Sequence, residues 1–517
     1  MGIRKSLWMM MVICLGAFIG VGCGNKAPEV EMTQDEPGVI APEVAQESVV
    51  AQQGGDIKIA MRSPKTLNPI LNMDKTVDKT LKLVFDTLVD FNEQDEVVPN
   101  LAKSWIMSGE GTVLDITLDP SIKWHDGAPL TPEDVIFSIK TIQEAVDSPY
   151  KPSIKNIISY TPTENNGVRI VYKESFSGYG HTLYFPIIPA HIENIGTHPI
   201  GTGAYVFESS VTNREMILKH NINYFKGEPN ISKIKVLFTP DDESDLYSFD
   251  QGLIDVVSTD VIDWEKYAKN KKSNINEYMT LNYDYIGMNF NKPIFQDIKM
   301  RQALLYATNR EYLLEKFYLY HGHVTDVPIS PSSWLYEPNS KEYEADVEKA
   351  KELLGDSTST IELLVNANNM QRVNVANALK KMYKDVGVTL EILEVDEAAF
   401  VERVQNKQYD LFLGGWDLSV IPDLSFAFHS AYADTGTNYG NYKNEKMDNL
   451  LKEAFNAKSN EQLKEVYSKL QLYISEQLPY LSLHFRTAAL ITNEKIKGDI
   501  KPHHMNVYQN IYEWYTN

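Results

Sequence analysis

Residues 124–135 read Trp-His-Asp-Gly-Ala-Pro-Leu-Thr-Pro-Glu-Asp-Val and form the most distinctive stretch of the chain. The Asp-Gly pair at 126–127 predicts a tight turn after a strand end, because these residue types favour turn conformations. Thr131 can cap a helix whose first position is Pro132, and the two acidic residues that follow favour the positive end of a helix. The stretch therefore predicts a strand end, a turn and a capped helix over 132–142.

His125 and Asp126 are the two side chains of this stretch that could carry catalysis in principle. Short polar side chains beside a turn more often hydrogen-bond to nearby backbone groups. We therefore expect both residues to fix the turn.

The rest of the chain alternates between strand and helix patterns, read from apolar residues spaced by two or by three to four. Strands are expected at 56–61, 114–118, 233–239, 283–289, 361–365, 389–395, 409–414 and 480–485. Helices are expected at 77–89, 299–317, 345–354, 371–386, 398–405, 444–455 and 461–476. The alternation between 361 and 414 indicates an α/β protein with parallel or mixed strands.

The N-terminus has the pattern of a secretory signal. A short basic start precedes an uncharged run over 7–21, which is shorter than the roughly 20 residues of a membrane-spanning helix. Val21-Gly22-Cys23 resembles a bacterial lipobox, although Gly20 stands where that signal usually has leucine. We expect a signal peptide over 1–22, a lipidated Cys23, and an extracytoplasmic protein anchored to the cell membrane.

Residues 23–53 form a different kind of segment. From residue 24 onwards they include six acidic residues, three prolines and no aromatic residue. Such a composition buries too little apolar surface to fold, so the segment is interpreted as a flexible acidic tether.

Composition excludes several classes of function. The formal charge is -21 and no basic run follows the signal, which disfavours nucleic acid as a partner. The two cysteines are Cys14, inside the signal, and Cys23, so neither a disulfide nor a cysteine zinc site is expected. About 460 residues remain after the tether, enough for two or more lobes.

Catalytic and cofactor motifs are weak throughout. Gly201-Thr202-Gly203 lacks the third glycine of a dinucleotide-binding turn and the Lys-Ser or Lys-Thr of a phosphate loop, so we expect a structural turn. The histidines include the close pairs His321/His323 and His503/His504 but no His-Glu-x-x-His pattern. Gly-x-Ser-x-Gly is absent as well. We predict no catalytic residue, no metal site and no cofactor.

A series of segments resembles, in order, the landmarks of family 5 of the bacterial extracellular solute-binding proteins, the peptide- and nickel-binding components of ABC importers. The segments are 66–69 (Thr-Leu-Asn-Pro), 99–105 (Pro-Asn-Leu-Ala-Lys-Ser-Trp), 124–135, 201–205, 251–255, 289–303 and 307–310. The resemblance covers nearly all of the chain after the tether.

The resemblance implies a fold of the periplasmic binding protein type II class, with two α/β lobes, a cleft between them and an inserted subdomain. On this basis lobe I is discontinuous and comprises 54–75, 196–285 and 487–517. The inserted subdomain comprises 76–195, and lobe II comprises 286–486. Ligands would be enclosed when the lobes close.

The resemblance also suggests where a ligand would bind. In the peptide binders of this family, an aspartate three positions after a tryptophan pairs with the amino terminus of the peptide. Here Trp416 is followed at that position by Ser419, with Asp417 and Asp423 nearby, and Arg486 could serve a carboxylate. The predicted ligand-binding residues are Trp416, Asp417, Ser419, Asp423, Arg486, Asn289 and Tyr285.

The function implied is capture of a small solute, an oligopeptide first of all, by a monomer that delivers it to the permease and ATPase subunits of an importer. Alternatives within the family are a nickel-chelate receptor, for which His429 and His484 are candidate ligands, and an oligosaccharide receptor. A secreted hydrolase is the alternative from another class. The peptide could also act as a signal rather than a nutrient.

Overall fold

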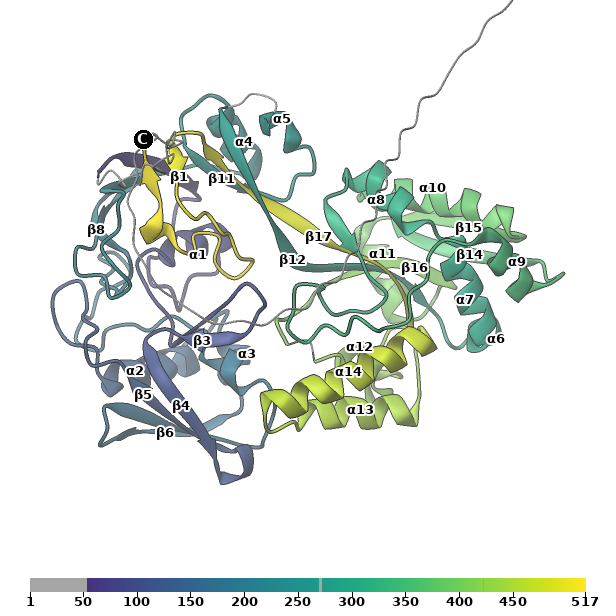
Figure 1. Ribbon diagram of the computed structural model, residues 1–517, viewed down its shortest axis with the longest axis horizontal. Coiled ribbons are helices and arrows are strands. Elements are labelled where there is room, and N and C mark those ends of the chain that lie inside the picture. Colours follow the sequence, from purple (N-terminus) through teal and green to yellow (C-terminus); the bar gives the residue numbers. More distant parts are fainter. Residues whose placement is uncertain (1–53, 269–271, 422) are drawn as a thin grey trace, which may run out of the picture. The chain divides into compact units, whose positions relative to one another are not determined.

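The computed structural model describes residues 54–268, 272–421 and 423–517 (Figure 1). The predicted signal peptide, Cys23 and the tether lie outside these residues. Among the helices described, none combines the length and the apolar character needed to cross a membrane.

A four-stranded sheet contains the first described strand. Its order is β1-β10-β9-β8, with β1 parallel to β10 and the other pairs antiparallel. Its strands are β1 (Asp56–Met61), β8 (Tyr205–Val211), β9 (Glu215–His220) and β10 (Lys233–Phe238). The strands expected at 56–61 and 233–239 are thereby confirmed. Helix α1 (Lys75–Leu81) follows β1.

A second four-stranded sheet lies within the predicted insertion. Its order is β4-β5-β7-β6, all antiparallel, and a small hairpin, β2 with β3, precedes it. The strands are β2 (Val89–Phe91), β3 (Val97–Pro99), β4 (Ala102–Ser108), β5 (Val113–Leu118), β6 (Ile157–Thr163) and β7 (Gly167–Tyr172).

Helix α2 (Pro132–Glu144) belongs to the same region and begins where the sequence predicts. Thr131 and Asp134 form a capping box, in which the Asp134 carboxylate accepts hydrogen bonds from the Thr131 amide at 2.8 Å and from Trp124 Nε1 at 3.2 Å. Asp134 is buried, and its other oxygen accepts a bond from the Ala190 amide at 2.8 Å, so both carboxylate oxygens have partners. Residues 124–135 therefore fix the start of α2 against the segment that contains Ala190.

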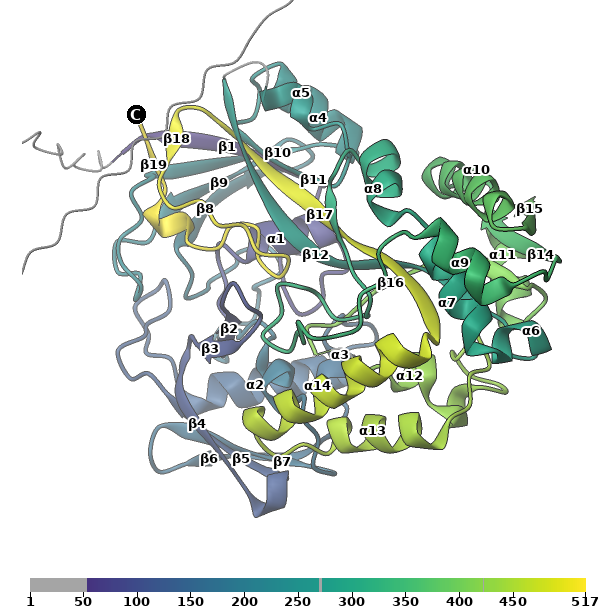
Figure 2. The same cartoon turned by 45° about the vertical axis from the view of Figure 1, so that its right-hand side comes forward.

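The largest sheet has the order β11-β17-β12-β16-β14-β15, with β13 also pairing with β17. Two long antiparallel strands, β12 (Ser273–Met288) and β17 (Tyr480–Asn493), run side by side through it (Figures 1 and 2). The other strands are β11 (Val256–Thr259), β13 (Gly322–Val324), β14 (Ser359–Asn366), β15 (Val388–Val395) and β16 (Leu411–Asp417). Strand β14 is parallel to β15 and β16, as the α/β alternation predicts.

Helices α7 to α11 pack against this sheet or against one another, whereas α13 and α14 pack together as a pair. The bounds are α7 (Ile298–Ala307), α8 (Arg310–Tyr318), α9 (Val347–Leu354), α10 (Met370–Asp385), α11 (Glu397–Gln405), α13 (Glu445–Phe455) and α14 (Asn460–Gln477). The remaining elements are α3 (Lys151–Ile154), α4 (Asp242–Asp250), α5 (Glu265–Ala268), α6 (Pro293–Gln296), α12 (Ser425–Phe428), β18 (Ile496–Lys497) and β19 (Tyr515–Thr516). The 3₁₀ turns are Gly109–Gly111, Tyr179–Leu183, Ser430–Tyr432 and Ile511–Glu513.

Two expected helices are wrong in extent. The helix expected over 77–89 ends at Leu81, because the carbonyls of Leu83 and Val84 accept hydrogen bonds from the amides of Tyr205 and Gly203, both at 2.9 Å. The helix expected over 299–317 is two helices. Thr308 has an extended ψ of 104°, and the Asn309 side chain caps α8.

Candidate ligand-binding site

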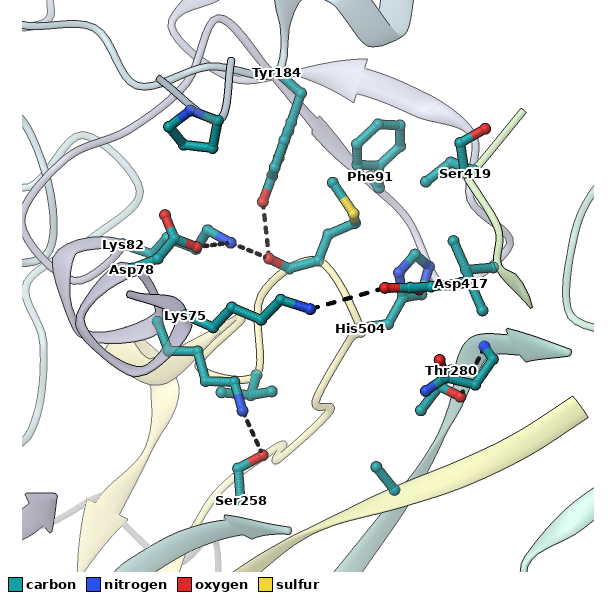
Figure 3. A pocket seen from close by; sticks show the side chains of 18 of the residues that line it. Lys75, Asp78, Lys82, Phe91, Tyr184, Ser258, Thr280, Asp417, Ser419 and His504 are labelled. Atoms are coloured by element: carbon teal, nitrogen blue, oxygen red, sulfur yellow. Dashed lines mark hydrogen bonds and ion pairs between the residues drawn. The ribbon is translucent and has the colours of Figure 1, made fainter. Parts of the chain in front are cut away.

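A pocket of about 840 Å³ lies where segments of both predicted lobes and of the predicted insertion meet. This volume falls in the range of sites that enclose small ligands. Its lining comes from segments 72–82, 149–153, 178–184, 258–260, 278–282, 417–421 and 504–507, with single residues from elsewhere. Residues far apart in the sequence therefore form one site, part of which is drawn in Figure 3.

Helix α1 presents three lysines to the pocket. Lys75, Lys79 and Lys82 are spaced by four and three positions, so they lie along one face of the helix. Asp74 fixes the start of the helix, because its carboxylate accepts bonds from the amides of Thr76 at 2.8 Å and Val77 at 3.1 Å. The cationic wall of the pocket is thus part of a capped helix.

The ammonium of Lys82 already has partners within the protein. Its Nζ lies 2.9 Å from Asp78 Oδ2 and donates to the Met505 carbonyl at 2.6 Å. Tyr184 donates to the same carbonyl at 3.1 Å. Although burial opposes it, the Asp78 carboxylate raises the pKa of Lys82. These bonds hold the C-terminal segment against α1.

Lys79, unlike Lys82, has no carboxylate partner in the part of the chain that the structure describes. Its Nζ donates to Ser258 Oγ at 3.2 Å, and no carboxylate of residues 54–268, 272–421 and 423–517 lies within ion-pair distance of it. Burial lowers the pKa of Lys79, as expected for an ammonium with no close counter-ion. Lys79 can therefore take an anionic group from a ligand.

Asp417 lies on the opposite wall, at the end of β16. Its Oδ2 lies 3.8 Å from Lys75 Nζ, and the two side chains are 69% and 90% exposed. A long ion pair between exposed groups contributes little free energy. Ser419, which also lines the pocket, donates to the Ile421 carbonyl at 2.7 Å.

Of the seven residues predicted to bind ligand, Asp417 and Ser419 line the pocket, and three others support its wall. Tyr285 is 1% exposed and stacks on Tyr480 at 4.0 Å, and half-buried Trp416 belongs to the same aromatic group. Asn289 is 2% exposed and donates to the carbonyls of Lys407 and Tyr409, both at 2.9 Å. These three residues hold β16 in position.

Asp423 and Arg486 also lie away from this pocket. Asp423 accepts a bond from the Ser425 amide at 3.0 Å and lines a separate cavity of about 80 Å³. Arg486 Nη2 donates to buried Asp284 at 2.9 Å, and Arg372 contacts the same carboxylate at 3.1 Å. Burial alone would raise the pKa of Asp284, but the arginines, Arg486 foremost, hold it below its ordinary value.

The histidines considered for a nickel chelate have other partners. His484 is 3% exposed and contacts Asp284 at 3.4 Å, and burial lowers its pKa to about 4. His429 Nδ1 accepts a bond from the Ala431 amide at 3.0 Å. Both lie outside the residues that line the pocket.

The stretch 124–135 has a structural role, as expected. The Asp126 carboxylate accepts a bond from the Ala128 amide at 3.0 Å and contacts His191 at 2.7 Å. His125 is held by the glycine turn at 201–203. Gly201 and Gly203 approach the chain at residues 83–84 so closely that a Cβ at Gly201 would lie 1.7 Å from the Val84 carbonyl oxygen.

The lysines of α1 and the C-terminal segment were missed by reasoning from the sequence. The spacing of Lys75, Lys79 and Lys82 was a usable signal, because it places three cations on one helix face. The C-terminal contribution, Met505 above all, carries no such signal, since it acts through its backbone carbonyl.

An α/β molecule with a pocket of this size, lined by charges of both signs, has the characteristics of a solute-binding protein. Residues 96–439 match the family model described as bacterial extracellular solute-binding proteins, family 5 Middle. The chain belongs to this family, whose members are solute-binding proteins rather than enzymes.

Individual relatives agree with this assignment. The oligopeptide-binding protein AppA of Bacillus subtilis is 26% identical over 504 residues, covering 90% of this chain and 92% of AppA. The structure of that AppA with a nonapeptide matches with a TM-score of 0.63 and 25% identity, over 90% of this chain and all of AppA. NikZ of Campylobacter jejuni with Ni(L-His) matches with a TM-score of 0.65 and 25% identity, over 89% of this chain and 99% of NikZ. The type II binding-protein fold expected from the sequence is confirmed.

Proposed function

We propose that this protein captures oligopeptides outside the cytoplasm and delivers them to the permease and ATPase subunits of an ABC importer. The observation that carries the proposal is the pocket's pair of opposite charges, Lys79 on one wall and Asp417 on another. A peptide is a zwitterion, so it needs one group of each sign. The oligopeptide-binding relative AppA supports the same ligand class.

Lys79 is the group proposed to bind the peptide carboxylate. Its ammonium is partly buried, lines the pocket and is held by a neutral hydroxyl, that of Ser258. A carboxylate would replace a neutral acceptor with a charged one, and hydrogen bonds to charged groups contribute about 1.5–3 kcal/mol. Lys82 is less suitable, because Asp78 and the Met505 carbonyl already occupy it.

Asp417 is the group proposed to bind the peptide ammonium. It stands two residues before Ser419, which occupies the position where peptide binders of this family carry their aspartate. Its partner Lys75 is exposed and 3.8 Å away, so a ligand ammonium can displace it at small cost. Ser419 would then shape the wall beside this contact.

The remaining parts of the proposal concern location and assembly. We propose that the chain is secreted, lipidated at Cys23 and tethered to the membrane by residues 23–53. It would act as a monomer. Extraction of labelled lipid with the protein, and its loss in Cys23→Ser, would test the anchor.

Peptide capture is tested by purifying the protein without denaturation and identifying co-eluting molecules by mass spectrometry. A peptide found in this way is then titrated by calorimetry in three forms: free, amidated at its carboxyl end and acetylated at its amino end. We expect Lys79→Met to weaken the free peptide by roughly tenfold to a hundredfold and to leave the amidated one unaffected.

Lys75→Met is the matched control, because it removes an exposed cation from the same helix. Recovery of no peptide, together with no thermal shift against a mixed peptide library, would contradict the proposal. A bound ligand at a hundredfold excess over its dissociation constant should stabilise the fold by about 2.7 kcal/mol.

A further inference from the structure

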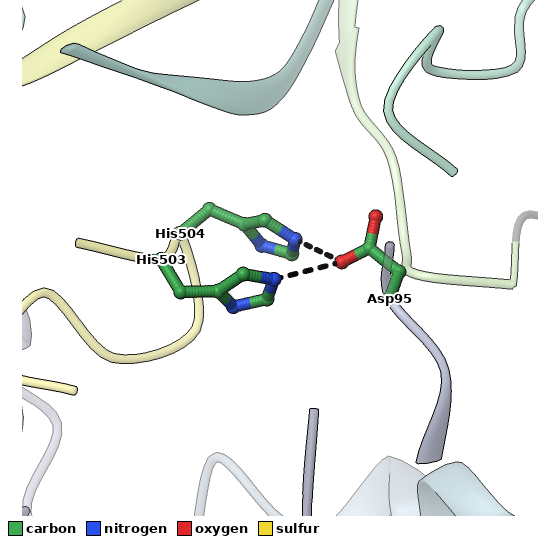
Figure 4. A group of neighbouring side chains, drawn as sticks. All are labelled: Asp95, His503 and His504. Atoms are coloured by element: carbon green, nitrogen blue, oxygen red, sulfur yellow. Dashed lines mark hydrogen bonds and ion pairs between the residues drawn. The ribbon is translucent and has the colours of Figure 1, made fainter. Parts of the chain in front are cut away.

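Three side chains meet at the edge of the pocket, apart from the proposed peptide contacts Lys79 and Asp417, and one of the three, His504, also lines the pocket. Asp95 lies on the turn between β2 and β3, and His503 and His504 belong to the C-terminal segment (Figure 4). Both imidazoles point to one carboxylate oxygen: Asp95 Oδ1 is 3.1 Å from His503 Nε2 and 2.6 Å from His504 Nε2. Asp95 is 1% exposed and His503 is 8% exposed.

The three donor atoms are close enough to share one ion, since all lie within 4.8 Å of one another. In a tetrahedral zinc site, with zinc–nitrogen distances of about 2.0–2.1 Å, neighbouring donors are separated by roughly 3.4 Å. Small side-chain movements would therefore complete the geometry. Two imidazole nitrogens and one carboxylate oxygen form a donor set that suits zinc and nickel.

The same arrangement also fits a metal ion. The two rings lie 4.2 Å apart and are tilted by 36°, with both Nε2 atoms aimed at Asp95 Oδ1. Two imidazole nitrogens and a buried carboxylate oxygen thus converge on one point, as the ligands of a divalent cation do. We propose that Asp95, His503 and His504 bind one divalent transition-metal ion, Zn²⁺ or Ni²⁺.

Metal binding would also act on the pocket. A metal-bound neutral imidazole carries its proton on the other nitrogen. His503 Nδ1 now accepts a bond from the Met505 amide at 3.2 Å, and this bond must be given up when Nε2 binds the ion. The carbonyl of Met505 accepts from Lys82 and Tyr184 on the pocket wall. The metal site is therefore coupled to the wall that faces the peptide.

The test uses the full mature chain without an affinity tag, freed of metal by a chelator and kept free of peptide. Titration with Zn²⁺ and Ni²⁺ by calorimetry should give one ion per chain, and Co²⁺ should give visible absorption bands of a bound site. His504→Ala and Asp95→Asn should each weaken binding by at least about tenfold. His198→Ala, which alters an exposed histidine of predicted lobe I, should leave binding unchanged.

His504→Cys guards against a folding defect, because it removes the hydrogen bond to Asp95 but keeps a zinc ligand. A folded His504→Cys protein that binds Zn²⁺ supports the site. Absence of a one-to-one ion in the wild-type chain overturns it, and so does binding that survives Asp95→Asn. Because these measurements contain no peptide, their failure leaves the proposed peptide function standing.

Discussion

His125 and Gly201 exchange two hydrogen bonds. The amide of His125 donates to the Gly201 carbonyl at 2.9 Å, and the amide of Gly201 donates to His125 Nδ1 at 3.2 Å. His125 Nε2 donates to the Gly203 carbonyl at 3.0 Å. Because one ring nitrogen accepts and the other donates, the imidazole is neutral in the fold.

This arrangement makes stability depend on pH. Burial lowers the pKa of His125 from 6.5 to about 4. The unfolded chain therefore binds more protons than the folded one between these values. The stability that the neutral ring provides is present above pH 6.5 and is lost as the pH falls towards 4, by on the order of 3 kcal/mol.

The measurement is the free energy of unfolding by urea at several pH values for the wild type and His125→Gln. Glutamine can keep one hydrogen bond but does not titrate, so the difference between the two proteins should shrink as the pH falls from 6.5 to 4. A difference that stays constant over this range would show that His125 is not the titrating group.

Gly201→Ala should destabilise the fold. The added Cβ would lie 1.7 Å from the Val84 carbonyl oxygen and 2.6 Å from its carbon, so the backbone of one segment must shift. We expect a loss of at least about 1–3 kcal/mol in the free energy of unfolding, the range for overpacked sites.

Gly127→Ala is a useful comparison. No neighbouring atom would meet its Cβ, but its φ of 89° makes the substitution a matter of backbone strain alone. Equal stability of Gly201→Ala and wild type would contradict the close packing.

The sequence best predicts those helix boundaries that depend on residues close together in the chain. The helix start at Thr131 and Pro132 is correct because the capping groups lie three residues apart. The end of α1 was missed because the carbonyls of Leu83 and Val84, just after the helix, bond to the amides of Tyr205 and Gly203, more than a hundred residues later. The local pattern at 83–84 is helical, and only this tertiary contact ends the helix earlier.

The same distinction applies to the site. The family resemblance drew attention to the residues after Trp416, of which Asp417 and Ser419 line the pocket. Arg486 is 202 residues from Asp284, so the sequence could not show that this carboxylate already engages its guanidinium. The prediction that Arg486 binds a ligand carboxylate required a guanidinium without a partner in the protein.

Asp284→Asn should be strongly destabilising. It would leave the charges of Arg372 and Arg486 in a largely buried site without their carboxylate, and breaking a buried pair in this way costs about 3–5 kcal/mol. Peptide affinity of the folded protein should not change, because Asp284 lies away from the pocket lining. Urea unfolding and calorimetry measure the two quantities separately.

Asp115→Asn is the matched control. Asp115 pairs with Arg169 across neighbouring strands, but Asp115 is 35% and Arg169 52% exposed, so only a small effect on stability is expected. If Asp284→Asn were no more destabilising than Asp115→Asn, the buried cluster would not be a stabilising element. If it weakened peptide binding in the folded protein, Arg486 would have to be reconsidered as a ligand contact.

Lys75 and Asp417 offer the sharpest test of how the pocket accepts a peptide. We expect Asp417→Asn to weaken a peptide with a free amino terminus by roughly tenfold or more, because a hydrogen-bonded ion pair with the ammonium is lost. Lys75→Met should leave affinity equal or slightly higher, since it removes the cation that competes for Asp417. Calorimetry with each variant gives both values.

The acetylated peptide separates this explanation from a general disturbance of the loop after β16. It carries no ammonium, so Asp417→Asn should affect it little. In the absence of peptide, the double variant should reveal a coupling between the two residues below about 1 kcal/mol, as for other exposed pairs. An equal loss for the free and acetylated peptides would show that Asp417 shapes the loop without binding the amino terminus.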